Sequence, residues 1–194
     1  MPLPSEWRAA SRRKLFESFH TQHPVGPTRS PIRAQLERLI RLNKTRADFQ
    51  QKFEDLIDSY NAGSRNIEQL FEELLKLSRS LTNEQARHVR ENMTEEELVV
   101  FDILTRPAPE LSPDERAEIK KVARELLTRL KQLLVINWRQ KSTARSQLKL
   151  AIEDALDDGL PKAYSPDLYR QKCSALFEHF YENYTDKEAS TYAA

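Results

Sequence analysis

The residues best suited to contact a ligand are four cations in the second half of the chain: Arg139, Lys141, Arg145 and Lys149. Residues 131–152 contain no acid, so no carboxylate of that stretch neutralises them. The last three are spaced by four residues, which places them at neighbouring positions on a helix. A phosphate backbone or an acidic protein surface would complement such a stripe.

A purely structural interpretation of these cations is equally open. Lys141 and Arg145 border the apolar arc of Leu148 and Ile152, so their aliphatic stems would cover the edge of a core while the charges stay in water. Trp138 is the one aromatic residue among the cations, and no recognition-helix signature accompanies them. The sequence therefore predicts either a binding surface or a solvated helix face.

Patterns typical of catalytic sites are missing. A phosphate-binding loop needs several glycines ahead of a Lys-Ser or Lys-Thr pair, and none of the three Gly residues lies shortly before Lys141-Ser142. Mg²⁺ sites need converging carboxylates, whereas the acids of Asp157-Asp158 and Glu95–Glu97 diverge on a helix. The histidines lack the i,i+4 spacing of helical metal sites. We expect no catalytic, cofactor-binding or metal-ligating residue in this chain. The four histidines, His20, His23, His88 and His179, are expected to be structural or surface residues.

The single cysteine and the hydropathy indicate a reducing compartment. Cys173 has no partner for an internal disulfide, and its place among apolar residues indicates a small buried hydrophobe. The longest aliphatic run, residues 133–136, is far shorter than the roughly 20 apolar residues that span a bilayer. The N-terminal cations are not followed by the apolar segment of a secretory signal. We expect a cytoplasmic protein without membrane contact.

Charge alternates along the chain in four blocks. The net charge is +7 over residues 1–46, −9 over 47–115, +8 over 116–152 and −5 over 153–194, which leaves +1 overall. Such alternation makes a dipolar surface, so nucleic-acid binding is compatible with the small net charge. In the other interpretation, neighbouring helices carry complementary charge and pair across their rims.

The composition predicts an all-α protein. Only three residues are Gly, 31% are charged, and apolar residues recur at helical spacing in most segments. We expect a bundle of about seven to eight helices with no significant sheet. The expected organisation is a lead-in or linker over 1–30, a first helical subdomain over 31–106, a Pro-rich connection over 107–112, a second subdomain over 113–184, and a tail over 185–194.

Several residues predict where helices begin and end. Gly63 and Gly159 follow apolar-periodic segments and predict helix ends. Thr82 and Thr94 each precede a Glu or Gln by three residues, a capping-box pattern that predicts two short helices. Asn137 is expected to cap the helix that carries the cations.

Four blocks of the sequence resemble a known family. The resemblance covers about residues 34–184 in order, through FQQKFEDLIDSYNAGSRNIEQLFEELLKL, EEELVVFDILTRPAPELS, KKVARELLTRLKQLLVINWRQKSTARSQLKLAIEDALDDGLP and LYRQKCSALFEHFYENY. These blocks are similar to the C-terminal helical region of the restriction (R, HsdR-type) subunit of type I restriction-modification enzymes.

The resemblance implies a part of a larger enzyme. Such subunits have an N-terminal nuclease domain, two RecA-like ATPase motor domains that translocate DNA, and a helical C-terminal region that docks onto the methyltransferase (M) and specificity (S) subunits. The parent subunit would be an ATP-dependent type I site-specific deoxyribonuclease, with ATP and Mg²⁺ bound only in its motor and nuclease domains. None of the family's catalytic residues has a counterpart in this chain.

The chain departs from the family at one position: where the family commonly has Asp-Trp-Arg, this sequence has Asn137-Trp138-Arg139. Asn replaces Asp equally well as a helix cap but not as a catalytic carboxylate, so the substitution favours the capping role. Trp138 is then expected to be an anchor that packs the start of the following helix.

Two functions follow as expectations. The first is an assembly module without catalytic activity, with the M and S subunits and the motor domains of the same R subunit as partners. The alternative is a module that grips duplex DNA non-specifically through the basic block of residues 116–152.

Overall fold

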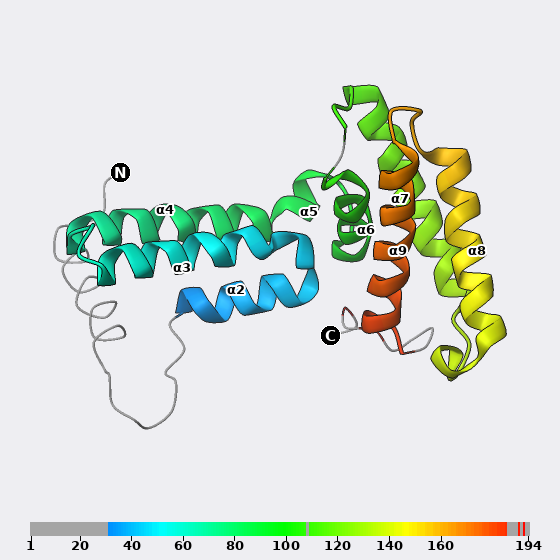
Figure 1. The fold of residues 1–194 in the computed structure, drawn as a ribbon, viewed down its shortest axis with the longest axis horizontal. Coiled ribbons are helices and arrows are strands. Elements are labelled where there is room, and N and C mark those ends of the chain that lie inside the picture. Colours follow the sequence, from blue (N-terminus) through cyan, green and yellow to red (C-terminus); the bar gives the residue numbers. More distant parts are fainter. Residues whose placement is uncertain (1–30, 108, 186–189, 191, 193–194) are drawn as a thin grey trace. The chain divides into compact units, whose positions relative to one another are not determined.

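The regular secondary structure of the described residues is helical, apart from an isolated bridge between Tyr184 and Ser190, and these residues form two compact units. The computed structural model describes residues 31–107 and 109–185 together with Ser190 and Tyr192. These residues contain eight α-helices and no β-strand, which confirms the predicted all-α class. One unit ends at Ala86 and the other begins at Arg87 (Figure 1). The predicted lead-in over 1–30 and most of the predicted tail lie outside the described residues.

The first unit packs three amphipathic helices around one core. Each pair of these helices is in contact. Their apolar stripes meet in a cluster that includes Leu36, Phe53, Leu74 and Leu81. The elements are α2 (Pro31–Leu42), the 3-10 helix η1 (Lys44–Arg46), α3 (Ala47–Asn61) and α4 (Ile67–Gln85).

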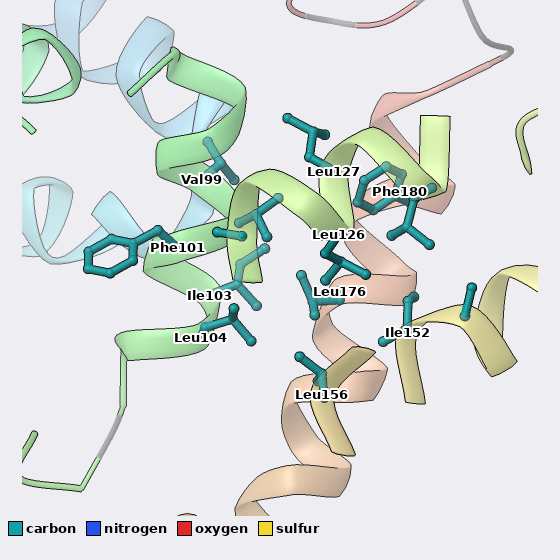
Figure 2. Close-up of a cluster of buried hydrophobic side chains, with 14 of the residues drawn as sticks. Val99, Phe101, Ile103, Leu104, Leu126, Leu127, Ile152, Leu156, Leu176 and Phe180 are labelled. Atoms are coloured by element: carbon teal, nitrogen blue, oxygen red, sulfur yellow. The ribbon is translucent and has the colours of Figure 1, made fainter. Parts of the chain in front are cut away.

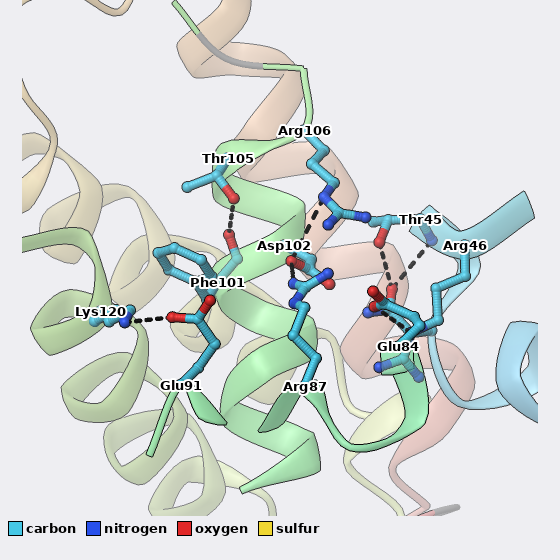
Figure 3. Close-up of polar contacts among 11 residues, drawn as sticks. Thr45, Arg46, Glu84, Arg87, Glu91, Phe101, Asp102, Thr105, Arg106 and Lys120 are labelled. Atoms are coloured by element: carbon cyan, nitrogen blue, oxygen red, sulfur yellow. Dashed lines mark hydrogen bonds and ion pairs between the residues drawn. The ribbon is translucent and has the colours of Figure 1, made fainter. Parts of the chain in front are cut away.

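A buried ion pair closes one end of the first unit. Arg46 is fully buried, and its Nε donates to Glu84 Oε1 at 3.1 Å (Figure 3). Asn43 begins η1 as its cap, because its Oδ1 accepts from the Thr45 backbone N at 3.1 Å. Since a buried charge without a partner is costly, Arg46 and Glu84 must be kept or lost together.

The second unit packs four longer helices against one another, together with one short helix and one 3-10 turn. Its elements are α5 (Arg87–Arg90), α6 (Glu95–Thr105), α7 (Pro113–Leu133), the 3-10 helix η2 (Trp138–Gln140), α8 (Ser142–Gly159) and α9 (Pro166–Asn183). Helix α6 contacts α7 and α9, and α8 contacts α7 and α9 in turn. Figure 2 shows side chains of α6, α7, α8 and α9 converging, among them Leu104, Leu126, Ile152 and Leu176.

All residues of helix α6 beyond its first turn and before its last residue are buried. Seven consecutive residues, 98–104, are buried, and only Asp102 among them is polar. A helix that is apolar all round must be enclosed by others. Arg87 and Arg106 both pair with the buried Asp102 carboxylate, Arg106 Nε at 3.7 Å from Oδ1 (Figure 3).

The boundary between the units differs from the one predicted at residues 107–112. The prolines interrupt the helix there, but they form a connection inside the second unit. Helix α6 precedes them, yet its buried residues share one cluster with α7, α8 and α9. A proline run marks the end of a helix, whereas only long-range packing decides to which core that helix belongs.

Two of the predicted helix ends occur for the predicted reason. Gly63 has φ +71° and donates its backbone N–H to Tyr60 O at 3.0 Å, while Ser64 N donates to Ser59 O at 3.0 Å. This is the Schellman arrangement that favours Gly. Thr94 begins α6 with a complete capping box formed with Glu97.

The helix start predicted at Thr82 is wrong, because α4 runs without interruption to Gln85. The Thr82 hydroxyl donates instead to Ser78 O within α4, at 3.0 Å. Leu81, one residue before it, is fully buried in the first core. Packing of α4 over its full length therefore outweighs the capping pattern.

Gly159 ends α8, but close packing explains it better than backbone conformation. A Cβ atom at this position would lie 2.5 Å from Val122 Cγ2 of α7. Non-bonded carbons do not approach that closely, so the missing side chain lets α8 approach α7. At Gly63, by contrast, a Cβ atom would meet nothing within 4 Å.

Replacing Gly159 by Ala should destabilise the second unit by about 1 kcal/mol, because overpacking of about 2 kcal/mol exceeds the roughly 1 kcal/mol that Ala gains in a helix. Chemical denaturation followed by circular dichroism measures the change. In a Val122→Ala background the same replacement should cost nothing. Gly63→Ala is the control, since its loss comes from backbone strain and Val122→Ala should not relieve it. Equal stability of Gly159→Ala and wild type would contradict the packing argument.

Candidate functional site

The structure divides the four predicted contact cations into two pairs. Arg139 and Arg145 make internal hydrogen bonds. Arg139 Nε donates to Tyr184 O at 3.2 Å and its Nη2 to Glu182 O at 3.2 Å, at the C-terminal end of α9. Arg145 Nη1 donates to Arg139 O at 2.6 Å. A cation at the C-terminus of a helix donates to the unpaired carbonyls there and interacts favourably with the negative end of the helix dipole. These two arginines therefore have a structural role.

Lys141 and Lys149 are the exposed pair. Neither lies within ion-pair distance of a carboxylate among the described residues. Lys141 precedes the first residue of α8 and makes no side-chain cap there. Lys149 lies on α8, with its Nζ 4.7 Å from the centroid of the Phe177 ring. Of the predicted stripe, these two side chains remain available to a partner.

Tertiary packing adds two aromatic residues that the sequence analysis missed. Tyr181 lies beneath the Arg139 guanidinium, with 5.6 Å from Cζ to the ring centroid. Phe177 stacks on Tyr181 with 6.1 Å between centroids. Both rings come from α9, between 28 and 42 residues beyond the cations in sequence. Their i,i+4 spacing was visible, but nothing in the sequence shows which helix they face.

Most cations of α7 are neutralised within the unit. They face carboxylates from the first turn of α6 and the segment before it. The pairs are Lys120–Glu91, with 2.5 Å between Nζ and Oε2 (Figure 3), Arg124–Glu97 and Lys131–Glu96. The ammonium of Lys120 holds the pKa of Glu91 below its ordinary value. Three of the ten cations of the basic block 116–152 thus pair with the preceding acidic block, as the second interpretation of the charge pattern expects for neighbouring helices.

Asn137 does not cap a helix with its side chain, contrary to the prediction. It adopts a left-handed backbone, φ 58° and ψ 29°, and its side chain makes no capping hydrogen bond. Asn tolerates this conformation better than most residues, which explains its presence in a tight turn. Trp138 next to it is fully buried, and its Nε1 donates to Tyr184 O at 3.0 Å. The indole therefore ties η2 to the end of α9.

Lys172 of α9 is a buried cation that the sequence analysis did not single out. Its Nζ donates to Ile103 O at 2.7 Å, and Tyr164 Oη donates to Leu104 O at 2.9 Å. Both carbonyls lie in the last turn of α6, where no intrahelical donor remains. Burial lowers the pKa of Lys172 to about 8. Burial also raises the pKa of the Cys173 thiol, so it is a poor thiolate nucleophile at neutral pH.

Within the described residues, no group of three or more His, Cys, Asp or Glu side chains is placed to hold a metal ion. No described helix is long and apolar enough to cross a membrane. The candidate contact surface of the second unit consists of the exposed cations and aromatic side chains at α8 and α9.

Reversing the charge at Arg139 should destabilise the second unit, while the same change at Lys141 should not. Arg139→Glu removes two hydrogen bonds to carbonyls and places a carboxylate against the negative end of α9, a loss of about 1.5 to 3 kcal/mol. Lys141→Glu should change stability by less than about 0.5 kcal/mol. Urea denaturation of the two variants measures the difference, and coincident transitions would refute the structural role of Arg139.

The stability of the second unit should depend on the ionisation of Lys172. The folded pKa lies below the ordinary value near 10.4, so the unfolded chain binds more protons between about pH 8 and 10.4. The free energy of unfolding of wild type, relative to Lys172→Met, should therefore rise with pH across this window. The rise should be on the order of 3 kcal/mol, at about 1.4 kcal/mol per pH unit. A difference that does not change with pH would show that Lys172 keeps its ordinary pKa.

Comparison with known proteins places this helical arrangement in a family. The family described as "Type I restriction enzyme HindI endonuclease subunit-like, C-terminal" matches residues 28–186. The chain is similar to the type I restriction enzyme HindI endonuclease subunit of Haemophilus influenzae, with 25% identity over 122 residues, 62% of this chain and 11% of that relative. The chain thus spans a small part of that protein's length. No solved structure matches. Because the match covers most of the chain, the chain belongs to the family of C-terminal regions of HindI-like type I restriction enzyme endonuclease subunits.

Proposed function

We propose that the chain is the C-terminal assembly domain of a type I restriction enzyme R subunit. It joins the motor and nuclease part of that subunit to the methyltransferase and specificity subunits. The observation that carries this proposal is the family match to a C-terminal region, together with a coverage of 11% of the similar endonuclease subunit. The nuclease and ATPase activities, with their Mg²⁺ and ATP, then belong to the remainder of the longer protein, and the whole enzyme acts on DNA in the cytoplasm.

The internal use of charge supports a scaffold role. Asp102 and Lys172 are buried in ion pairs or hydrogen bonds that connect α6 to its neighbours. Arg139 connects η2 to α9 in the same way. Groups engaged like this hold helices at fixed positions, whereas a general acid or base must reach a substrate. We assign no catalytic role to any residue of this chain.

The duplex-binding alternative receives less support. Non-specific DNA affinity depends on the number of phosphates that cations neutralise. Lys120, Arg124 and Lys131 of the basic block pair with carboxylates instead. Arg139 and Arg145 donate to backbone carbonyls. The few remaining cations make a protein partner the better explanation.

Deleting residues 31–184 from the longer R subunit should abolish its assembly with the M and S subunits. The truncated subunit should keep its own ATP binding, because the motor lies elsewhere. Co-elution on size exclusion measures assembly, and nucleotide affinity is the control for folding. The isolated chain, added in excess, should compete with the intact subunit for the same partners. Normal assembly of the truncated subunit would overturn the proposal.

A further inference from the structure

One corner of the second unit presents apolar side chains to solvent on a rigid turn. Ile136 is 75% exposed and Val135 is 46% exposed, although Leu134 before them and Trp138 after them are buried. The turn is closed by a hydrogen bond from Trp138 N to Val135 O at 3.0 Å, and Asn137 within it is left-handed. Buried anchors on both sides therefore hold Ile136 out in water.

The same corner continues across α9 and α8 through ring contacts. Trp138 meets Tyr181 edge to face with 5.9 Å between centroids, and Tyr181 stacks on Phe177. Lys149 Nζ lies over the Phe177 ring. Tyr181 is itself 42% exposed. We call the side chains of Ile136, Lys141, Lys149, Phe177 and Tyr181 the corner surface.

The cations of the corner surface lack acidic partners. Elsewhere in the second unit the cations of α7 face carboxylates, as Lys120 faces Glu91. Lys141 and Lys149 make no ion pair with any described carboxylate. A partner with carboxylates would supply the missing negative charge, and its approach would be steered by these two lysines.

We propose that the corner surface docks a protein segment that carries both carboxylates and apolar side chains. The apolar side chains of that segment cover Ile136 and Tyr181, while its carboxylates pair with Lys141 and Lys149. This deepens the proposed assembly function and rests on it, since it places the segment on the methyltransferase and specificity subunits. Aromatic residues and arginine are enriched in protein interfaces, and here the exposed Tyr181 lies under Arg139.

A nucleic acid fits the corner surface less well. Bases bind exposed aromatic residues by stacking on a free ring face. Here the Arg139 guanidinium lies over Tyr181 and the Lys149 ammonium over Phe177. Contact with phosphates would also leave Ile136 in water, since its side chain can make no favourable interaction with them. A protein segment is the occupant that uses both the charge and the apolar area.

The test uses the full-length R subunit and its M and S subunits. Two variants alter the corner surface: Ile136→Ser, and Lys141→Glu combined with Lys149→Glu. Each should weaken binding to the M and S subunits at least about tenfold. The double charge reversal should act mainly on the association rate and lose its effect in high salt.

Two matched variants in the same unit serve as controls. Val89→Ser removes an apolar side chain that is 69% exposed on α5. Lys121→Glu reverses an exposed charge on α7. Both should bind like wild type, and all variants should keep the wild-type melting temperature within about 2 °C.

The outcomes separate this inference from the proposed function. If deletion of residues 31–184 abolishes assembly while the corner variants bind like wild type, the domain docks through another surface and this inference is wrong. If the deletion leaves assembly intact, the proposed function fails as well. If the corner variants lose duplex DNA affinity but keep assembly, the occupant is a nucleic acid, which also overturns the inference.

Discussion

The burial of α6 is the constraint on which the second unit depends. A helix with seven consecutive buried residues must pack against other elements, and α7 and α9 both contact it. Every polar group of such a helix must then find its partner inside the protein. Arg87 reaches Asp102, and Lys172 and Tyr164 reach carbonyls of the last turn. Satisfying α6 thus fixes residues from three other segments, namely α5, the loop before α9, and α9.

The same logic explains the alternation of charge along the chain. Acidic side chains in the first turn of α6 interact favourably with the positive end of the helix dipole, and cations of α7 form ion pairs with two of them. Part of a positive block in the sequence therefore becomes a paired surface in the fold. Arg139 and Arg145 are a second case, because each guanidinium donates a hydrogen bond to a backbone carbonyl of another element. Arg139 donates to Glu182 O of α9, and Arg145 donates to Arg139 O of η2. What remains for a partner is a small set of cations next to exposed apolar residues.

These features suit a domain that transmits position rather than performs chemistry. Under the proposed function the chain anchors a motor that translocates DNA, and charges that hold its helices together would resist the force of that motor. The buried pairs Arg46–Glu84 and Arg87–Asp102 give each unit its own internal fixation. The side chain of Ile136 is largely exposed and so contributes little burial to the unit, which is why we assign it to recognition.

The sequence by itself determined the helical class, most helix ends and the family, because these depend on local signals: Gly63 for a left-handed cap, Thr94 with Glu97 for a capping box, and apolar residues at helical spacing. Tertiary structure alone decided the rest. The boundary at residues 86 and 87, the structural role of Arg139, the backbone role of Asn137 and the buried charge of Lys172 each depend on partners far away in the chain. A cation shows its charge in the sequence, but whether that charge faces a carboxylate, a carbonyl or water is fixed only when helices distant in sequence pack together.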